Sequence, residues 1–339
     1  MLSERTWERS RGLTQYRSIA SWLVHNVGNR RAGEAPNVSP TKSNLARQGV
    51  PMIDDIRIDA VSETLFLPLY ALALESQRPD PIMVDQDAVD LTCRLNDYFA
   101  DSRKRIFRRL AKGKLPSLLL TTLSMRIRRF DRYAREFLER EPRGVVVSLG
   151  CGLDDRRRRV DNGLVRWYDL DLSEVIELRR RFLPETERMR FIASSVLDFA
   201  WLDQLPDGPG PAFLFLAEGL LPYLPRDGVR ALVAKLAEAR PGAELVAEVV
   251  NSRTVRMMQS PLGRGKFQRE FGVSGNVVFR SGLADSREME AWAPGLAFLD
   301  DWTYYDDDDP KLGAIRWFAR FAFIHWLQWT VHYRLGTGP

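Results

Sequence analysis

The sequence predicts an α/β protein built around a parallel, doubly wound sheet. Short apolar strands alternate with helical stretches from residue 144 to residue 250. Within this region, the β-branched run Val145–Val147 leads into a glycine turn at Gly150 and Gly152, and an acid follows at Asp171, about 20 residues further on. Such glycines let the backbone approach a nucleoside ligand, and an acid at the tip of the next strand accepts hydrogen bonds from ribose hydroxyls.

Composition limits the class of protein. The 339 residues are 45% apolar, enough for a large core, and the net charge of +5 resides in the first 50 residues. From residue 51 onward, 42 basic and 42 acidic residues cancel, which argues against a nucleic-acid partner. Cys93 and Cys151 are too few for a disulfide framework or a metal site, so we expect no metal and a reducing, cytoplasmic location. We expect no membrane span and no signal peptide, since no apolar run is long enough.

The chain before the sheet divides into two parts. We expect residues 1–50 to be a basic, mobile extension, or a segment upstream of a start at Met52. We expect residues 51–143 to form a helical cap, with Ser62 capping a helix from Glu63, further helices at 88–98 and 116–141, and a solvated basic helix face at 103–114.

The main domain is expected at 144–339. Its predicted strands are 145–149, 165–171, 189–193, 212–217 and 244–250, and its clearest helices are 173–182 and 226–239. Residues 251–292 look mainly helical with a break at Gly263 and Gly265, and we expect a substrate-side insertion at about 251–295. Further strands are expected at 297–305 and 328–335, and the acidic turn 306–309 is interpreted as a solvated loop.

The glycine turn also bears on the kind of ligand. A pyrophosphate-binding turn carries a third glycine where this chain has Asp155, and the adjacent carboxylates of Asp154 and Asp155 would repel phosphates. They would tolerate a phosphate-free ligand with a positive centre, such as S-adenosylmethionine, so a nicotinamide oxidoreductase is disfavoured. The alternative interpretation is an ordinary strand and turn with a solvated acidic pair.

Seven segments of the chain resemble the leucine carboxyl methyltransferase family, especially its bacterial branch associated with polyketide O-methylation. They are SETLFLPLYALALES (62–76), MRIRRFDRYAREFL (125–138), VVSLGCGLDDR (146–156), VRWYDLDLSEVIELRRRF (165–182), FIASSVLDFAWLD (191–203), AEGLLPYL (217–224) and WTVHYRLG (329–336). The resemblance covers about residues 55–336. It implies a class I methyltransferase fold, with a seven-stranded sheet whose last strand inserts antiparallel.

The resemblance also implies roles for individual residues. Arg126 matches the arginine that contacts the methionine carboxylate, Gly150 and Gly152 match the glycine turn, and Asp171 matches the ribose-binding acid. The remaining matches are Asp198 near the adenine amino group with Phe199 beside it, Glu218 on the methionine amino group, and Tyr223 beside the transferred methyl group. One position departs from the family, which usually has Asp-Thr where this chain has Asp154-Asp155, so one hydroxyl bond to the cofactor is lost.

The chemistry of methyl transfer leaves three functions open. The leading one is S-adenosylmethionine-dependent O-methylation of a small-molecule carboxylate or hydroxyl, in which the enzyme aligns the reacting atoms in a dry pocket. A carboxylate is already ionised near neutral pH and needs no base. A phenol would need one, and His332 or Glu218 would then be candidates, although we expect His332 to be structural. The alternatives are methylation of a protein C-terminus and a non-catalytic cofactor-binding scaffold. The acceptor and the oligomeric state do not follow from the sequence.

Overall fold

The sheet has seven strands in the order β3-β2-β1-β4-β5-β7-β6. Every strand runs parallel to the others except β7, which pairs antiparallel with β5 and β6. This confirms the predicted α/β class and the seven-stranded arrangement with an antiparallel last strand. The strands are β1 (Val145–Leu149), β2 (Arg166–Asp171), β3 (Met189–Ala193), β4 (Phe213–Ala217), β5 (Glu244–Val250), β6 (Ala297–Trp302) and β7 (Gln328–Arg334).

The computed structural model describes residues 64–207, 211–260, 278–307, 309–313, 317 and 326–336. The predicted extension 1–50, the start at Met52 and the break at Gly263 and Gly265 lie outside these residues, as do His25 and His325.

Helices cover both faces of the sheet, which explains why its central strands are continuous apolar runs. All residues of β1 and β4 are buried. Phe130 and Phe137 of α6 (Ser117–Arg140) pack against one face. The other face is covered by α9 (Arg226–Ala239) and by the 3₁₀ helix η3 (Phe199–Gln204), which brings in the buried Trp201. The short helix α7 (Arg156–Val160) follows the glycine turn, and α8 (Ser173–Phe182) joins β2 to β3.

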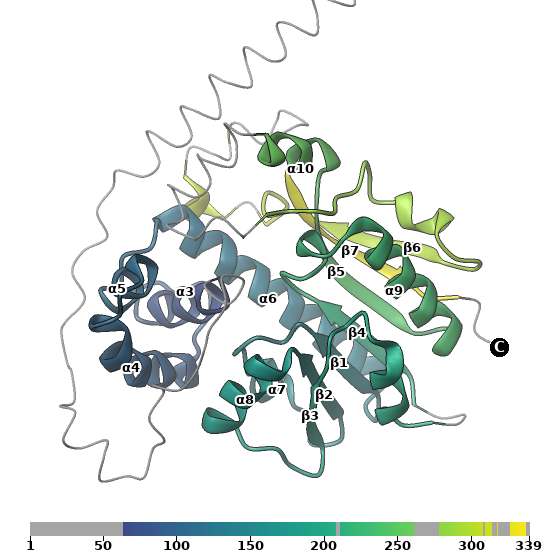
Figure 1. The fold of residues 1–339 in the computed structure, drawn as a ribbon, viewed down its shortest axis with the longest axis horizontal. Coiled ribbons are helices and arrows are strands. Elements are labelled where there is room, and N and C mark those ends of the chain that lie inside the picture. Colours follow the sequence, from purple (N-terminus) through teal and green to yellow (C-terminus); the bar gives the residue numbers. More distant parts are fainter. Residues whose placement is uncertain are drawn as a thin grey trace, which may run out of the picture.

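A helical cap lies beside the sheet, next to α6 (Figure 1). It consists of α3 (Phe66–Ser76), α4 (Gln86–Ala100) and α5 (Arg105–Ala111). Its own core is aromatic, with the rings of Phe99 and Phe107 stacked at 4.4 Å between centroids and Phe66 edge-on to both. The long helix α6 serves both parts, because its first half packs into the cap core and its second half packs on the sheet.

The segment after β5 differs from the helical prediction for 251–292. Among the described residues, only α10 (Ser252–Gln259) and a 3₁₀ turn, η5 (Glu288–Ala291), are helical there. Leu283 instead pairs with Asn251 in a parallel bridge beyond the end of β5. Gly282 allows this close approach, since a Cβ there would lie 2.8 Å from the Val250 carbonyl oxygen. The local pattern suggested a helix, but the backbone N–H groups of Arg280 and Ser281 donate to Pro222 and that of Leu283 donates to Val250.

The described residues were searched for membrane-spanning helices and for metal sites. None of the helices in this part of the chain is long and apolar enough to cross a membrane. Within the same residues, no group of three or more histidine, cysteine or acidic side chains is arranged to hold a metal ion.

Candidate active site

Acids and a glycine from four neighbouring strands lie in a row at the carboxyl edge of the sheet. The register sets Asp171, at the end of β2, level with Gly150 beyond β1. By the same register, Glu218 follows β4 at that level and Glu248 lies beside it in β5. We call Asp171, Gly150, Glu218 and Glu248 the edge row. This is the edge at which open α/β sheets bind their ligands.

The glycine turn brings Asp171 to the backbone of the loop after β1. Gly150 and Gly152 have φ values of +67° and +57°, a conformation that favours glycine. The Gly152 N–H donates to Asp171 Oδ2 at 2.9 Å, and the Leu172 N–H donates to Oδ1 at 2.8 Å. Burial raises the pKa of Asp171 in spite of these bonds. Each carboxylate oxygen retains a second lone pair, which a ribose diol could use.

A buried ion pair supports the turn from below. Asp169, two residues before Asp171 in β2, accepts from Arg179 Nη2 at 2.6 Å and from Trp167 Nε1 at 2.8 Å. Arg179, on α8, also donates to the Gly152 carbonyl oxygen at 3.0 Å. Asp169 is therefore engaged in a buried ion pair, while Asp171 bonds to the backbone of the glycine turn.

Arg126 joins two members of the edge row. Its Nε donates to Glu218 Oε1 at 2.8 Å, and its Nη1 donates to Glu248 Oε1 at 2.6 Å. The Gly219 N–H donates to the other oxygen of Glu248 at 2.6 Å. Burial raises the pKa of Glu248 although Arg126 opposes the shift, and the neighbouring Glu218 raises it further. Arg126 is thus a buried ion-pair partner rather than a solvated arginine.

The helix after the glycine turn adds two more buried arginines. Arg156 donates through Nη2 to Glu218 Oε2 and through Nε to Asp131 Oδ1, the latter at 2.8 Å. Arg159 binds Asp131 at 2.7 Å and Asp154 at 2.6 Å. These bonds tie α7 to α6 and to the end of β4.

The arginines change the interpretation of the acidic pair after the turn. Burial alone would raise the pKa of Asp154, but Arg159 and Arg156 hold it well below its usual range. Asp154 is therefore neutralised by its own helix, and the prediction that it would repel a phosphate as a bare anion is wrong. Asp155 differs: burial raises its pKa, its Oδ1 is buried without a hydrogen-bond partner, and Arg158 lies 3.4 Å from Oδ2.

The remaining predicted site residues lie near this edge. Asp198 follows β3 and caps η3 by accepting from the Ala200 N–H at 3.4 Å, and Phe199 is the first residue of that helix. Among the bonds of the described residues, none joins Asp198 to the edge row. Tyr223 ends the 3₁₀ helix η4 (Leu221–Tyr223) and packs edge-on against Phe279 at 5.3 Å. Burial, together with the charge of Glu248, raises the pKa of Tyr223 to about 12.

Sequence reasoning missed several residues of this cluster. Glu248 could have been predicted, because it is a charged residue in the interior of the apolar strand ELVAEVV, which begins with Glu244. Asp131 and Arg156 could not have been predicted, because charged residues at these spacings usually lie on a solvated helix face.

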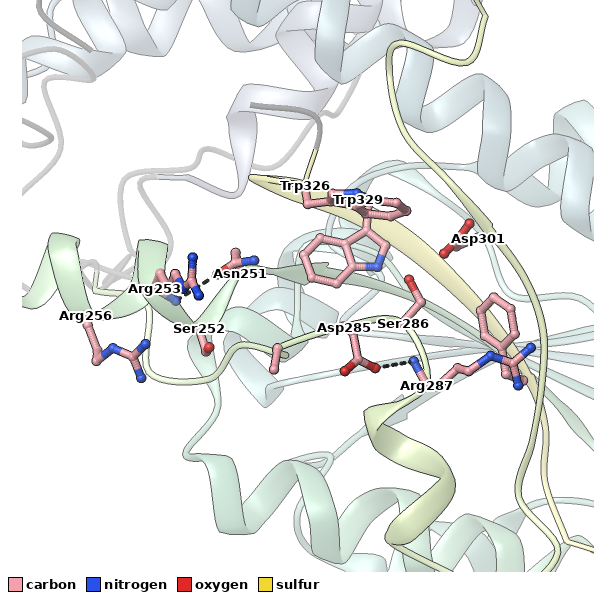
Figure 2. Close-up of a pocket in the computed structure, with 12 residues that line it drawn as sticks. Asn251, Ser252, Arg253, Arg256, Asp285, Ser286, Arg287, Asp301, Trp326 and Trp329 are labelled. Carbon is pink, nitrogen blue, oxygen red and sulfur yellow. Dashed lines mark hydrogen bonds between the residues drawn. The ribbon is translucent and has the colours of Figure 1, made fainter. Parts of the chain in front are cut away.

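A cavity of about 1020 Å³ lies beyond the end of β5, against β6 and β7 (Figure 2). Its walls come from α10, the segment 284–287 and the two indoles of Trp326 and Trp329, whose ring centroids are 5.6 Å apart. Arg253, Arg256 and Arg287 also line it. It begins at Asn251, directly after β5, and none of the predicted cofactor residues lines it.

Residues 67–237 match the family model for leucine carboxyl methyltransferases. The chain belongs to the leucine carboxyl methyltransferase family. It is 33% identical over 256 residues to the tetracenomycin polyketide synthesis O-methyltransferase TcmP of Streptomyces glaucescens, covering 75% of this chain and 87% of that protein. It is 28% identical over 294 residues to the S-adenosyl-L-methionine-dependent methyltransferase dpfgK of Gibberella zeae, covering 84% and 95%. The protein is an S-adenosylmethionine-dependent methyltransferase, as the family resemblance of its sequence implied.

Among solved structures, this leucine carboxyl methyltransferase family member is similar to the magnesium protoporphyrin IX methyltransferase ChlM from Synechocystis PCC 6803 with bound SAH. The TM-score is 0.41 at 13% identity, over 71% of this chain and 97% of that one. At this identity and TM-score, the assignment of the fold depends on the strand order of the sheet itself.

The residues at the edge row suit this cofactor chemically. Carboxylates of Glu218 and Asp171 match an ammonium group and a ribose diol, and Arg126 matches a carboxylate. Gly219 also matters, because it has φ +63° and a Cβ there would lie 3.7 Å from both Arg126 Nη2 and Glu248 Oε2. The absence of a side chain at this position keeps space open in front of the charged groups.

Proposed function

We propose that this methyltransferase methylates a carboxylate oxygen of a small molecule with an aromatic body. In this proposal Asp171 binds the ribose, Asp198 and Phe199 contact the adenine, and the turn at Gly150 and Gly152 lets the backbone approach the nucleoside. Arg126 and Glu218 hold the amino-acid end of the cofactor, and Tyr223 lies beside the methyl group. The relative TcmP is named as a polyketide O-methyltransferase, which supports an oxygen acceptor of this kind.

The observation that carries the carboxylate is the state of the acids and bases at the edge row. Glu218 accepts from two arginines, and Glu248 accepts from Arg126, Gly219 and Gln328, so taking a proton from the acceptor would cost either carboxylate an existing charge-assisted bond. The pKa of the Tyr223 hydroxyl is raised to about 12, so Tyr223 is protonated at neutral pH and cannot act as a base. An acceptor that is already ionised does not need one.

The described histidine cannot supply the base either. His332 Nε2 lies 2.8 Å from Glu244 Oε2, and Glu244 is the first residue of β5, at the amino edge of the sheet. The ring of His332 also packs edge-on against Tyr133 at 5.2 Å. These contacts support a structural role for His332.

Bound S-adenosylmethionine supplies an activated methyl group on a sulfonium. The acceptor oxygen forms the new C–O bond as the C–S bond breaks, so a carboxylate gives a methyl ester and neutral S-adenosylhomocysteine, with no proton left over. The contribution of the chain is positional: buried ion pairs hold Arg126 and Glu218 rigid, and helices α3 and α6 exclude water. The indoles beside Asn251 offer an apolar surface for the body of the acceptor, with arginines nearby for further acidic groups.

An acceptor panel tests this proposal. Purified protein with labelled S-adenosylmethionine is offered aromatic carboxylates, the matching phenols and aliphatic carboxylates, and methyl transfer is measured between pH 6 and pH 9. We expect aromatic carboxylates to react, with a rate that is flat over this range. A preference for phenols with a rate that rises with pH would contradict the carboxylate assignment. A peptide with a free C-terminus serves as the protein-type acceptor.

The cofactor roles are tested separately with Asp171→Ala. Loss of the ribose acceptor is expected to weaken S-adenosylhomocysteine binding about tenfold or more, as measured by titration calorimetry, since a bond to a charged group contributes about 1.5–3 kcal/mol. Unchanged affinity would remove the ribose role from Asp171.

A further inference from the structure

We propose that Arg156 is a positioning residue that orients the Glu218 carboxylate toward the amino-acid half of the cofactor. The inference rests on the proposed role of Glu218, and it concerns recognition rather than chemistry. It implies that the amino-acid end of the cofactor is bound by a network of side chains from α6, α7, β5 and the end of β4, and not by Glu218 alone.

The two oxygens of Glu218 are held by different helices. Oε1 accepts from Arg126 Nε of α6, and Oε2 accepts from Arg156 Nη2 of α7. A carboxylate gripped at both oxygens cannot rotate about its last bond. Each oxygen keeps one further lone pair, and these now point in fixed directions. An ammonium group would meet a pre-oriented acceptor, so little conformational entropy is lost on binding.

Both arginines are themselves anchored. Arg126 is held on its far side by Glu248 at 2.6 Å, and Arg156 is held by Asp131 at 2.8 Å and Asp154 at 3.2 Å. The side chains of Arg156 and Asp131 are 6% and 1% exposed. In such a low-dielectric site, charge-assisted bonds are strong and their geometry is restrictive.

The charge of the cluster fits a cofactor whose sulfonium gives it a net positive charge, and the ammonium group of its amino-acid end supplies the partner for Glu218. Three arginines, Arg126, Arg156 and Arg159, face five carboxylates, namely those of Asp85, Asp131, Asp154, Glu218 and Glu248. All of these side chains are at most 17% exposed. A buried cluster with more acids than arginines favours a ligand that brings a cation, and the ammonium group does so.

A comparison of two ligands separates positioning from mere structural support. S-adenosylhomocysteine carries the amino-acid end, whereas 5′-methylthioadenosine has the same nucleoside and thioether but neither the amino nor the carboxyl group. In Arg156→Gln, we expect S-adenosylhomocysteine to bind about tenfold or more weakly by calorimetry, the loss expected for one charge-assisted bond. We expect 5′-methylthioadenosine affinity to change less than about twofold, because its contacts lie at Asp171.

Three other variants make the result specific. Arg158→Gln lies on the same helix, but Arg158 is 48% exposed, pairs with Asp87 and Asp155, and contacts no member of the edge row, so neither affinity should change. Asp171→Ala should weaken both ligands alike. Arg156→Lys keeps the charge, folds if the glutamine variant does not, and should restore part of the S-adenosylhomocysteine affinity.

The outcomes distinguish this inference from the proposed function. If Arg156→Gln weakens both ligands equally, or weakens neither, Arg156 has only a structural role and the inference is wrong. If the parent protein binds both ligands equally well and Glu218→Gln changes neither, the proposed role of Glu218 itself fails. A selective loss for both Glu218→Gln and Arg156→Gln supports the two together.

Discussion

Asp131 is a buried acid of α6 that holds two arginines of the helix after the glycine turn. Its Oδ1 accepts from Arg156 and its Oδ2 accepts from Arg159, and only 1% of its side chain is exposed. Charges that are buried and paired in this way cost much more when one partner is removed than the intact pair contributes. At the residue scale, removal of any one partner of these ion pairs would leave an uncompensated buried charge and destabilise the site.

Replacement of Asp131 by asparagine keeps the shape and removes the charge. We expect Asp131→Asn to lower the free energy of unfolding by about 3 kcal/mol, because two buried guanidiniums lose their shared counter-ion. Urea unfolding measures this change. On the same helix, Glu136→Gln breaks an exposed pair with Arg132 and should alter stability by less than about 0.5 kcal/mol. Equal effects of the two substitutions would show that burial does not decide the energy.

At the scale of elements, strand β5 has two glutamates, one near each of its ends. Glu248 belongs to the edge row, whereas Glu244 begins the strand and accepts from Arg140 of α6 at 2.7 Å. Glu244 also contacts His332 of β7 at 2.8 Å. Thus β5, β7 and α6 are joined at the edge of the sheet opposite the edge row.

The joint at Glu244 predicts a dependence of stability on pH. Burial alone would raise the pKa of Glu244, but the bonds from His332 and Arg140 hold it below its usual value. A carboxyl group with a lowered folded pKa contributes stability above its unfolded pKa of about 4.3, and this is lost as the pH falls through the folded pKa. We expect Glu244→Gln to make the loss of stability below about pH 4.5 shallower than in the parent, as measured by urea unfolding at several pH values. An unchanged slope would contradict the assignment.

At the scale of the whole molecule, the cap and the sheet share a core and several ion pairs (Figure 1). Leu153 and Leu178, from the sheet domain, belong to the hydrophobic cluster of the cap. Asp85 of the cap binds Arg159 at 2.7 Å, and Glu75 binds Lys311 at 2.7 Å. The edge row therefore lies where two structural parts meet, with α6 common to both.

This arrangement predicts that the cap and the sheet unfold together. Residues 51–143 contain no tryptophan, whereas Trp167, Trp201 and Trp329 are buried in the sheet domain. With Trp7 and Trp22 replaced by phenylalanine, tryptophan fluorescence reports on residues 144–339, and far-ultraviolet circular dichroism also reports on the cap helices. We expect both signals to change at the same urea concentration, since shared buried contacts couple the two parts. A circular dichroism change that precedes the fluorescence change would show that the cap unfolds independently.

The sequence alone determined most of the framework. The bounds of β3, β5, α8 and α9 agree with their predictions, because apolar runs and helical periods are local signals. It also determined the glycine turn and Asp171, since their order along a βαβ unit is set by the backbone. The segment 278–287 was not predictable in this way, because its bonding partners lie on β5 and η4.

Only the tertiary structure decided which charges meet. Arg126 and Glu248 are 122 residues apart, and Arg156 and Glu218 are 62 apart, so no local pattern indicates that they pair. The packing of α6 and α7 over the sheet converts side chains with the spacing of a solvated helix face into a buried cluster. The same packing neutralises Asp154, which sequence reasoning treated as a bare anion. Backbone order follows from local sequence, whereas the electrostatics of this site follow from burial and from partners that are distant along the chain.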